Sequence, residues 1–383
     1  MKIVIAPDSF KESLSAMEIA TEIEAGFREI FPQAEYLKIP AADGGEGTAQ
    51  TLIDATSGKR IELVVTGPLG EPVKAFYGLL GGDGAAVIEM AAASGLTLIS
   101  PERRNPLKTS SYGTGELIRS ALDAGARRFI LGIGGSATND GGAGMLQALG
   151  VHLLDASGAE LGPGGAELAR LDRIDVSQLD PRLKSCQVDV ACDVTNPLIG
   201  PKGASAIFGP QKGATPEMIV QLDANLRHYA EVISRDLGCE VADAPGAGAA
   251  GGMGAAMLAF LGGRLRPGSE IVTEAIGLDA ALENADLVIT GEGRIDGQSV
   301  GGKTPVGVAR VARARGVPVI GLGGCLAPDS HLVHQYGINA VFSSLRKPCS
   351  LEEALSEAAF NVRSAARNIA AVLEMGMQIK KGD

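Results

Sequence analysis

Side chains that can do chemistry are concentrated in short glycine-rich stretches of this sequence. The stretch GQSVGGKT, Gly297–Thr304, has the spacing of a P-loop, in which backbone amides and a lysine hold nucleotide phosphates. A working P-loop joins a strand directly to a helix, but here the apolar run DLVIT ends at Thr290 and GEGRID intervenes. Since the chain contains 53 glycines, we interpret the match as accidental. We still predict that Lys303 reaches substrate or phosphate.

The intervening GEGRID segment offers charged side chains where a predicted parallel strand ends. Glu292, Arg294 and Asp296 alternate with other residues just beyond DLVIT. Proteins with α/β folds bind their ligands at this end of their strands. Because the flanking glycines leave these charges little packing role, we prefer a functional site to a solvated turn. We predict that Glu292 and Asp296 bind a metal ion and that Arg294 is catalytic.

Two stretches near the N-terminus have the same arrangement. APDSFKESLSA follows the strand KIVIA, and ADGGEGT follows the strand YLKIP. We predict that the carboxylates of these stretches, Asp8, Asp43 and Glu46, bind metal. Ser9 is predicted to bind substrate or phosphate, and Lys11 is predicted to be catalytic. The competing interpretations are an N-cap loop in the first stretch and a turn with positive φ in the second.

The stretch GIGGSATNDGGAG, residues 132–144, is the clearest anion-binding candidate. It follows the strand RFIL and precedes the helix MLQALG, so amides and a helix N-terminus converge there. We predict that it binds ATP phosphates or a substrate carboxylate. The predicted binding residues are Gly134, Gly135, Ser136, Thr138 and Asn139.

The same stretch supplies the main alternative. Gly132-x-Gly134-x-x-Ala137 fits a dinucleotide fingerprint, and Asp155 follows about twenty residues on, where a ribose ligand would lie. This pattern favours an NAD-dependent dehydrogenase of a small hydroxy acid. We place that function second because Asn139 and Asp140 add polar groups that pyrophosphate does not need.

The segment VDVACDVTNPL carries the predicted general base. Asp193 follows a predicted strand and precedes Asn196, which is similar in chemistry to the way kinases hold Mg²⁺ or position a hydroxyl. We predict that Asp193 is a general base or a metal-positioning carboxylate. The alternative is an Asx turn before Pro197.

These stretches require an α/β scaffold. Both ends of the chain alternate short apolar runs with helical segments, which indicates a doubly wound parallel sheet of Rossmann or flavodoxin type. The middle contains strands joined by turns before helices return. We therefore predict two domains: a discontinuous one from residues 1–66 and 283–383, and an inserted α/β domain, 67–282.

Composition excludes several classes of function. The net charge is −11, tryptophan is absent and aromatic residues make up 4%, so a nucleic-acid partner is not expected. The five cysteines have neither metal nor disulfide spacing, which indicates a reducing compartment. The longest apolar stretch is too rich in glycine and alanine for a membrane span. We predict a cytoplasmic protein without a membrane partner, and the sequence leaves a homodimer open.

Taken together, the motifs resemble the bacterial glycerate kinase family, of the type related to the glycerate 2-kinases of glycolate and glucarate breakdown. The likeness covers nearly the whole chain. Its motifs are APDSFKESLSA, ADGGEGT, GPLG, SYGTGELI, GIGGSATNDGGAGMLQALG, CDVTNPL, FGPQKGA, PGAGAAGGMG and TGEGRID. The resemblance implies ATP-dependent phosphorylation of D-glycerate at the 2-hydroxyl. It also implies a two-domain α/β fold that is not a P-loop fold. Carboxylates for Mg²⁺ and glycine-loop amides for phosphates fit that chemistry.

Overall fold

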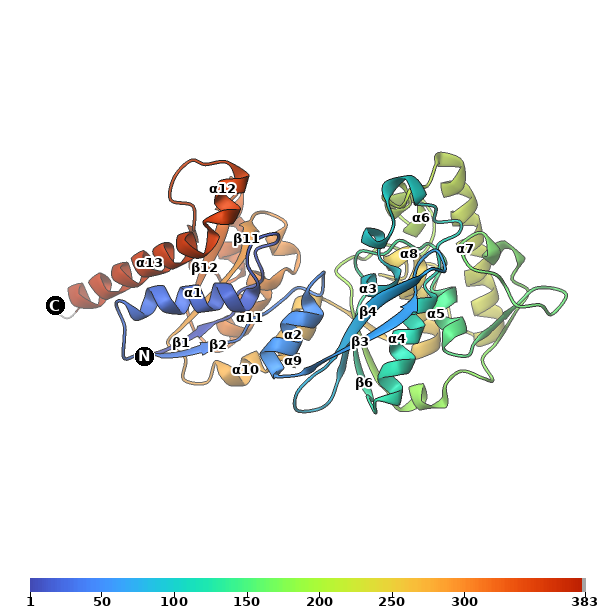
Figure 1. Ribbon diagram of the computed structural model, residues 1–383, viewed down its shortest axis with the longest axis horizontal. Coiled ribbons are helices and arrows are strands. Elements are labelled where there is room, and N and C mark those ends of the chain that lie inside the picture. Colours follow the sequence, from blue (N-terminus) through green and yellow to red (C-terminus); the bar gives the residue numbers. More distant parts are fainter. Residues whose placement is uncertain (381–383) are drawn as a thin grey trace. The chain divides into compact units, whose positions relative to one another are not determined.

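The computed structural model describes residues 1–380 and divides them into two compact units (Figure 1). The first unit contains residues 1–43, 54–56 and 268–380, and the second contains residues 44–53 and 57–267. The predicted boundaries at 66 and 283 lie elsewhere. Residues 57–66 belong with the second unit because most of them form a strand of its sheet. Residues 268–282 belong with the first unit because their helices pack against one of its own.

The first unit is built on a sheet of five parallel strands. Their order is β13-β12-β11-β1-β2, which is 2-1-3-4-5 when the strands are counted along the chain. This is the doubly wound, flavodoxin-like order, so the predicted fold class is confirmed. The strands are β1 (Lys2–Ile5), β2 (Glu35–Lys38), β11 (Leu287–Ile295), β12 (Val319–Leu326) and β13 (Ala340–Ser343).

Two long helices cover one face of this sheet, α1 (Ala16–Arg28) and α13 (Ala358–Lys380). They lie side by side (Figure 1), and a Cβ atom on Gly26 of α1 would come within 2.4 Å of a backbone oxygen of α13. A capping box at Ser15 and Glu18 begins α1, as its sequence pattern indicates. The apolar residues that join these helices to the sheet include Ile19, Ile23, Phe27, Val362, Ala366 and Ile369.

The other helices of the first unit are shorter. Helix α11 (Thr304–Ala314) contacts β11 and also packs against α9 (Gly268–Ala275). Two more short helices complete the unit, α10 (Leu278–Ala281) and α12 (Leu351–Ser356). Residues 296–303, which include a 3-10 turn at Ser299–Gly301, connect β11 to α11.

The second unit contains a six-stranded mixed sheet in the order β10-β9-β6-β5-β4-β3. The hairpin of β3 and β4 is antiparallel, and β5, β6, β9 and β10 run parallel. These strands are β3 (Lys59–Thr66), β4 (Pro72–Leu79), β5 (Ala86–Glu89), β6 (Arg128–Gly132), β9 (Gln187–Ala191) and β10 (Arg264–Arg266). A separate antiparallel pair consists of β7 (His152–Leu154) and β8 (Arg173–Asp175).

Several helices surround that mixed sheet. The longest, α7, and the glycine-rich α8 contribute to one large apolar core with the strands. The helices are α3 (Ala91–Ser94), α4 (Tyr112–Asp123), α5 (Ala143–Ala148), α6 (Ala204–Phe208), α7 (Pro216–Leu237) and α8 (Ala249–Leu261). Helix α2 (Thr48–Thr56) contains residues of both units.

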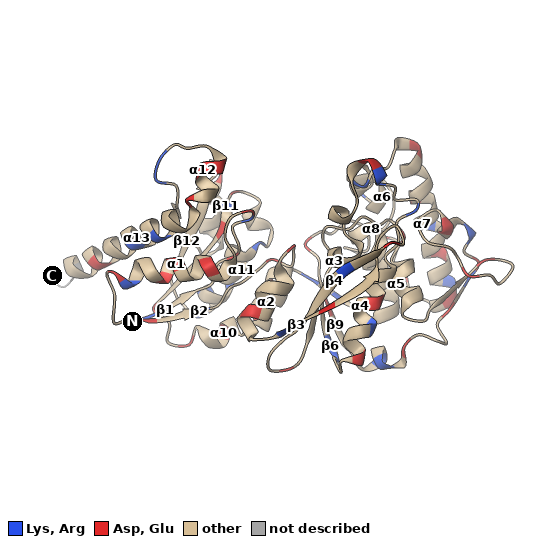
Figure 2. Ribbon diagram, in the orientation of Figure 1, with Lys and Arg blue, Asp and Glu red and all other residues tan. Residues whose placement is uncertain are grey.

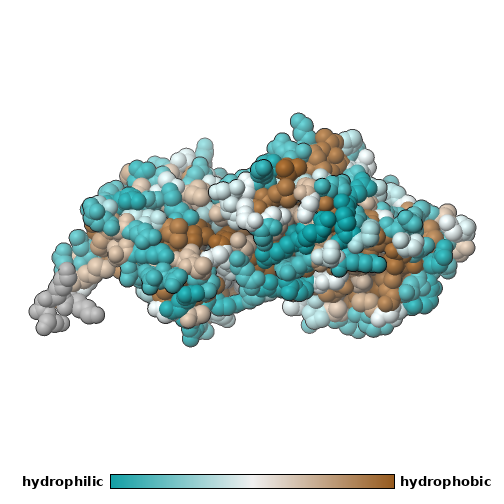
Figure 3. All heavy atoms as spheres, turned by 90° about the horizontal axis from the view of Figure 1, so that it is seen from below, coloured by the Kyte–Doolittle hydropathy of each residue, from teal (hydrophilic) through white to brown (hydrophobic). Residues whose placement is uncertain are grey.

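The surface is mixed in charge and polarity. Acidic and basic residues are interspersed along the helices and loops of each unit (Figure 2). On the face drawn in Figure 3, hydrophilic residues predominate and hydrophobic residues form smaller areas between them. No helix among residues 1–380 combines the length and apolarity needed to cross a bilayer.

Candidate active site

A cavity of about 650 Å³ lies in the first unit, where β1 and β11 end. These neighbouring strands flank the point at which the winding of the sheet reverses, which is where doubly wound proteins bind ligands. The cavity brings together the predicted residues that belong to this unit. They are Asp8, Ser9, Lys11, Asp43, Glu292, Arg294, Asp296 and Lys303.

Asp8 is held rigidly at the entrance to the loop after β1. Its backbone N–H donates to the carbonyl oxygen of Gly291 at 2.8 Å, which ties the loop to β11. The amide of Ser9 donates to Oδ1 at 2.6 Å, and the hydroxyl of Thr304 donates to Oδ2 at 2.6 Å. Burial, with a smaller contribution from the nearby carboxylate of Asp43, raises the pKa of Asp8 to about 6 against the lowering effect of the hydrogen bonds from Thr304 and Ser9.

Glu292 is the second buried carboxylate of the cavity and belongs to β11 itself. It accepts a short hydrogen bond from the hydroxyl of Ser299, and the ammonium of Lys303 lies 3.6 Å from Oε2. Burial raises the pKa of Glu292 to about 7, against the opposing effects of Ser299 and Lys303. The ammonium of Lys303 also lies 4.0 Å from Asp296, so this lysine faces two carboxylates.

The donor set of the cavity suits a small hard cation only in part. No three His, Cys, Asp or Glu side chains within residues 1–380 form a group that could hold a metal ion. The predicted metal set of Asp8, Asp43, Glu46, Glu292 and Asp296 is therefore not assembled as one cluster. Magnesium, however, is commonly bound by one or two carboxylates together with substrate phosphates and water. Asp8 and Glu292 provide such a pair, and burial, the main cause of the raised pKa of each, would be offset by a cation bound between them.

The stretch GQSVGGKT contributes Lys303 to the lining of this cavity, and several of its backbone amides are already hydrogen-bonded. The prediction that its strand ends at Thr290 was wrong, because β11 continues to Ile295. The amide of Gln298 donates to the carboxylate of Asp296, and that of Ser299 donates to the carbonyl of Asp296. The amide of Gly301 donates to the carbonyl of Gln298. Since these amides have local hydrogen-bond partners, the stretch contributes to the cavity through the side chain of Lys303.

The glycine loop of residues 132–142 lies in the second unit and differs from its prediction. Gly134 and Gly135 are exposed, but the side chains of Ser136, Thr138 and Asn139 are buried. Thr138 and Asn139 are 0% exposed, so neither side chain can contact a ligand in this conformation. The predicted binding surface of this loop is therefore limited to backbone near Gly134 and Gly135.

A buried lysine donates hydrogen bonds to two residues of that loop. The ammonium of Lys212 donates to the hydroxyl of Ser136 at 2.8 Å and to the carbonyl oxygen of Thr138 at 2.6 Å. Lys212 is 1% exposed, and burial lowers its pKa to about 7. Sequence analysis missed this lysine, whose only signal was its position in the motif FGPQKGA. It fixes the backbone of the loop.

The helix after the loop is not open to an anion. Helix α5 has only six residues, and the carboxylate of Asp140 accepts hydrogen bonds from the amides of Gly142 and Gly144, each at 3.2 Å. The same carboxylate accepts from the amide and hydroxyl of Ser111, at 2.8 and 2.7 Å. Asp140 thus occupies donors that a phosphate at this helix N-terminus would need, and the binding of an anion by the loop stays a prediction.

The remaining predicted residues, Glu46 and Asp193, are also in the second unit. Glu46 is exposed in a loop whose amides at Gly47 and Ala49 donate to the carboxylate of Glu89. Asp193 is exposed just after β9, as its sequence pattern predicts. Glu46 thus lies on the loop before α2, and Asp193 lies on the loop after β9.

The dinucleotide fingerprint lacks its structural context. Asp155 follows β7, which pairs antiparallel with β8 in a separate sheet and does not lie beside β6. Its carboxylate already accepts from the hydroxyl of Ser157 and pairs with Arg170, and hydrogen bonds from Ser157 and Ala159 lower its pKa to about 2. A ribose would have to displace these partners, which argues against the dehydrogenase alternative.

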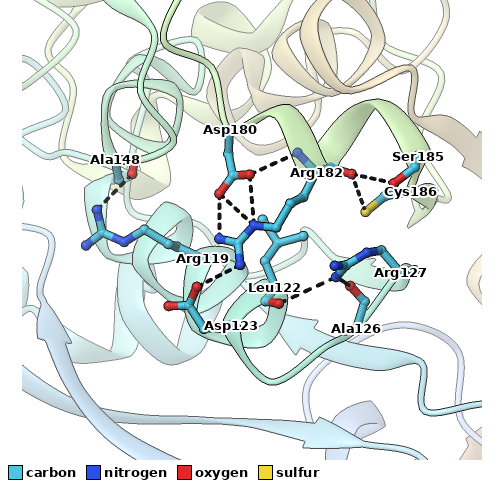
Figure 4. Close-up of polar contacts among 10 residues, drawn as sticks. All are labelled: Arg119, Leu122, Asp123, Ala126, Arg127, Ala148, Asp180, Arg182, Ser185 and Cys186. Atoms are coloured by element: carbon cyan, nitrogen blue, oxygen red, sulfur yellow. Dashed lines mark hydrogen bonds and ion pairs between the residues drawn. The ribbon is translucent and has the colours of Figure 1, made fainter.

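A group of arginines in the second unit also fails as an anion site (Figure 4). Arg182 is paired on both sides, at 2.6 Å with Asp180 and at 2.9 Å with Asp123. Arg127 donates to the carbonyl oxygen of Ala126 at 2.7 Å. These arginines already donate to carboxylates or to backbone carbonyl oxygens, so the group stabilises the packing between α4 and the turn before β9.

Known proteins similar to this chain share its full length. The model of the glycerate kinase family matches residues 3–374. Glycerate 2-kinase of Escherichia coli (strain K12) is 61% identical, with 99% of each chain covered. Glycerate kinase of Bacillus subtilis (strain 168) is 58% identical over 98% of each chain. A crystal structure of a protein assigned as glycerate kinase 2 of Salmonella typhimurium LT2 superposes with a TM-score of 0.92, at 60% identity and 99% coverage of each chain.

Proposed function

The chain belongs to the glycerate kinase family, and on that premise we propose that it transfers the γ-phosphoryl group of ATP to the 2-hydroxyl of D-glycerate. The observation that carries this proposal is the cavity at the ends of β1 and β11, where buried carboxylates face a lysine. Phosphoryl transfer depends mainly on positioning and on compensation of charge. A cavity with Asp8, Glu292 and Lys303 on its walls supplies both.

Asp8 and Glu292 are the residues that would hold Mg²⁺. The ion would neutralise phosphate charge when bound. Thr304 and Ser299 fix the two carboxylates by donating to them, so the pair is oriented before any ligand arrives. Asp43 and Asp296, on the same cavity, add negative charge that favours a cation there.

The basic residues of the cavity would bind the transferred phosphoryl group and the glycerate carboxylate. Lys303 faces carboxylates, so phosphate would exchange one anionic partner for another without leaving the ammonium unpaired. Arg294 is more exposed and lies 3.4 Å from Asp296, and Lys11 is exposed at the rim. We assign these three residues to charge stabilisation, with Ser9 as a hydrogen-bonding group for substrate.

The general base stays a prediction. Asp193 is our first choice because an exposed carboxylate fixed after a strand can accept the proton of the glycerate hydroxyl. If Asp193 is dispensable, the role passes to Asp43 or Asp296, which line the cavity. Gly134 and Gly135 remain candidates for backbone contacts with phosphate or substrate.

One assay tests the function directly. The purified protein is given D-glycerate and MgATP, ADP release is followed, and the product is identified by phosphorus–proton NMR. We expect ADP release that depends on glycerate and a phosphorus coupled to the proton at carbon 2. Coupling to the protons at carbon 3 would contradict the assigned position, and reduction of NAD by glycerate would favour the dehydrogenase.

We also infer the cellular compartment of the enzyme, and its oligomeric state can be measured. All five cysteines are free thiols, which fits a reducing, cytoplasmic compartment. Light scattering during size-exclusion chromatography distinguishes a monomer from the homodimer that the sequence leaves open.

A further inference from the structure

We propose that the apolar half of the same cavity, formed by α12 and the start of α13, binds the adenine base of ATP. The nucleotide would then be held by the first unit, with its phosphates toward Asp8, Glu292 and Lys303. This inference rests on the proposed function, because it assumes that the phosphoryl donor is a nucleotide. It adds the location of the base, which neither the motifs nor the comparisons assign.

The size of the cavity favours a ligand larger than glycerate. Cavities of ~300–1,000 Å³ hold ligands of drug size, and this one is about 650 Å³. The buried carboxylates and Lys303 occupy only one part of it. A molecule with a charged end and a flat apolar end, such as ATP, matches a cavity whose walls differ in the same way.

The apolar wall consists of aliphatic side chains that are partly open to solvent. Leu345, Leu351, Leu355 and Ala358 line it. Leu345 is 39% exposed and Leu351 is 72% exposed, although both are large hydrophobic residues. Exposed apolar groups that rim a cavity mark ligand sites, because a bound apolar surface removes them from water. The faces of a purine are such a surface.

A buried amide on this wall supplies the polar contact that a base needs. Asn361 is 4% exposed and lines the cavity. Its Oδ1 accepts from Nε of Arg346 at 2.6 Å, and Arg346 is held in turn by Glu357 and by the ring of Phe360. Because a guanidinium can only donate, the atom of the amide that faces it must be the oxygen.

The other end of that amide therefore has a defined role. With Oδ1 assigned to Arg346, the remaining Nδ2 group is a donor, and it makes no hydrogen bond within residues 1–380. Adenine presents unprotonated ring nitrogens that accept hydrogen bonds. An oriented and unpaired donor on a largely buried residue, beside an apolar wall, is the arrangement that fixes a purine in place.

Two native thiols allow this assignment to be tested without any mutation. Cys325 and Cys349 line the cavity, whereas Cys192 and Cys239 are in the second unit and serve as internal controls. The protein is alkylated with iodoacetamide, with and without MgADP, and each cysteine is quantified by mass spectrometry. We expect MgADP to slow modification of Cys325 and Cys349 by at least about fivefold at saturation, with D-glycerate alone having little effect.

Substitutions give an independent readout. Asn361→Asp keeps the acceptor for Arg346 and the shape of the side chain but removes the Nδ2 donor. We expect KM for ATP to rise about tenfold, the effect of one lost hydrogen bond, with KM for glycerate unchanged. Ala358→Phe fills the apolar half and should weaken ADP binding more strongly. Val372→Phe, at a site on α13 that is 60% exposed, is the matched control and should change neither constant.

The outcomes separate this inference from the proposed function. If the enzyme phosphorylates glycerate but MgADP protects Cys192 or Cys239 and leaves Cys325 and Cys349 reactive, the base lies elsewhere and the inference is wrong. The same conclusion follows if Asn361→Asp and Ala358→Phe fold normally and bind ADP as the unmodified protein does. If MgADP protects Cys325 and Cys349 but glycerate is not phosphorylated, the nucleotide site stands and the proposed function fails.

Discussion

The hydroxyl of Thr304 donates a 2.6 Å hydrogen bond to the carboxylate of Asp8, two residues separated by 296 positions in the sequence. This bond joins the first residue of α11 to the loop after β1 and fixes the carboxylate in the cavity. It makes the orientation of Asp8 depend on a residue that is 0% exposed and contacts no solvent.

The first prediction concerns this bond. Thr304→Val keeps the shape of the side chain but removes the donor, so Asp8 loses a partner that orients it. Hydrogen bonds to charged groups contribute ~1.5–3 kcal/mol, and we expect kcat/KM to fall by ~10–100-fold. Thr304→Ser should restore most of the activity. If Thr304→Val and the unmodified enzyme have equal kcat/KM, Asp8 does not need this partner.

Lys303 distinguishes charge stabilisation from a P-loop role. We expect Lys303→Ala to lower kcat by roughly 10²-fold, as removal of one group that stabilises the transition state does, while ATP still binds. The affinity for ATP is measured by calorimetry on the folded variant. Complete loss of ATP binding would mean that GQSVGGKT is a true phosphate-binding loop after all.

Asp193 tests the assignment of the general base. Asp193→Asn retains size and most hydrogen bonding but removes basicity, so kcat should fall by ~10²–10⁴-fold if this residue accepts the hydroxyl proton. Thermal unfolding of the variant should match that of the unmodified protein, because the side chain is exposed. Near-normal kcat would transfer the role to Asp43 or Asp296, whose Asn variants are then the next measurements.

Gly134 and Gly135, adjacent glycines in the second unit, allow two alanine substitutions to be compared. Gly135 has φ of +71°, and a Cβ atom there would lie 3.3 Å from Ala91, whereas a Cβ atom on Gly134 would meet open space. We expect Gly135→Ala to lower the free energy of unfolding by ~1 kcal/mol and Gly134→Ala to leave it unchanged. If the backbone here contacts substrate or phosphate, Gly134→Ala raises one KM. Unchanged values of both KM constants in Gly134→Ala would remove this loop from the site.

Because Lys212 is buried, we expect the free energy of unfolding to increase as the pH rises. Burial lowers its pKa from 10.5 to about 7, so between these values the unfolded chain binds a proton that the folded chain does not. The free energy of unfolding therefore rises with pH across that window, by up to ~1.4 kcal/mol per pH unit, and the cost of the buried charge is fully present below it. Lys212→Met lacks this dependence. Denaturant unfolding of both proteins across the window measures the difference, and parallel curves would contradict it.

Much of the first unit was predictable from local pattern. Strands β1 and β11 are short apolar runs, and side chains that follow parallel strands gather at one edge of the sheet. That rule is why Asp8 and Glu292 could be named before their contacts were known, whereas Lys303 was named from the spacing of GQSVGGKT. The rule does not require knowing which strands are neighbours, because the direction of the parallel strands alone defines the edge of the sheet at which their carboxyl ends lie.

The interactions that tune the site were not predictable in the same way. Thr304 and Ser299 gain their roles from contacts with Asp8 and Glu292, and the length of β11 decides where both lie. Asn361 belongs to an ordinary amphipathic helix, and its function depends on Arg346 holding one end of its amide. In the glycine loop, sequence indicated exposed hydroxyls, whereas tertiary packing buries Thr138 and Asn139.

The order of strands in the first unit has a consequence for how the protein is made. Strand β1 is an interior strand that pairs with β2 on one side and with β11 on the other, yet the whole second unit is synthesised between β2 and β11. A growing chain on the ribosome therefore carries β1 with one edge unpaired until nearly three hundred residues have been added. The second unit can complete its core during that interval, and the nucleotide cavity can form only after it. Protection of the nascent N-terminal segment from aggregation is thus a requirement of this fold.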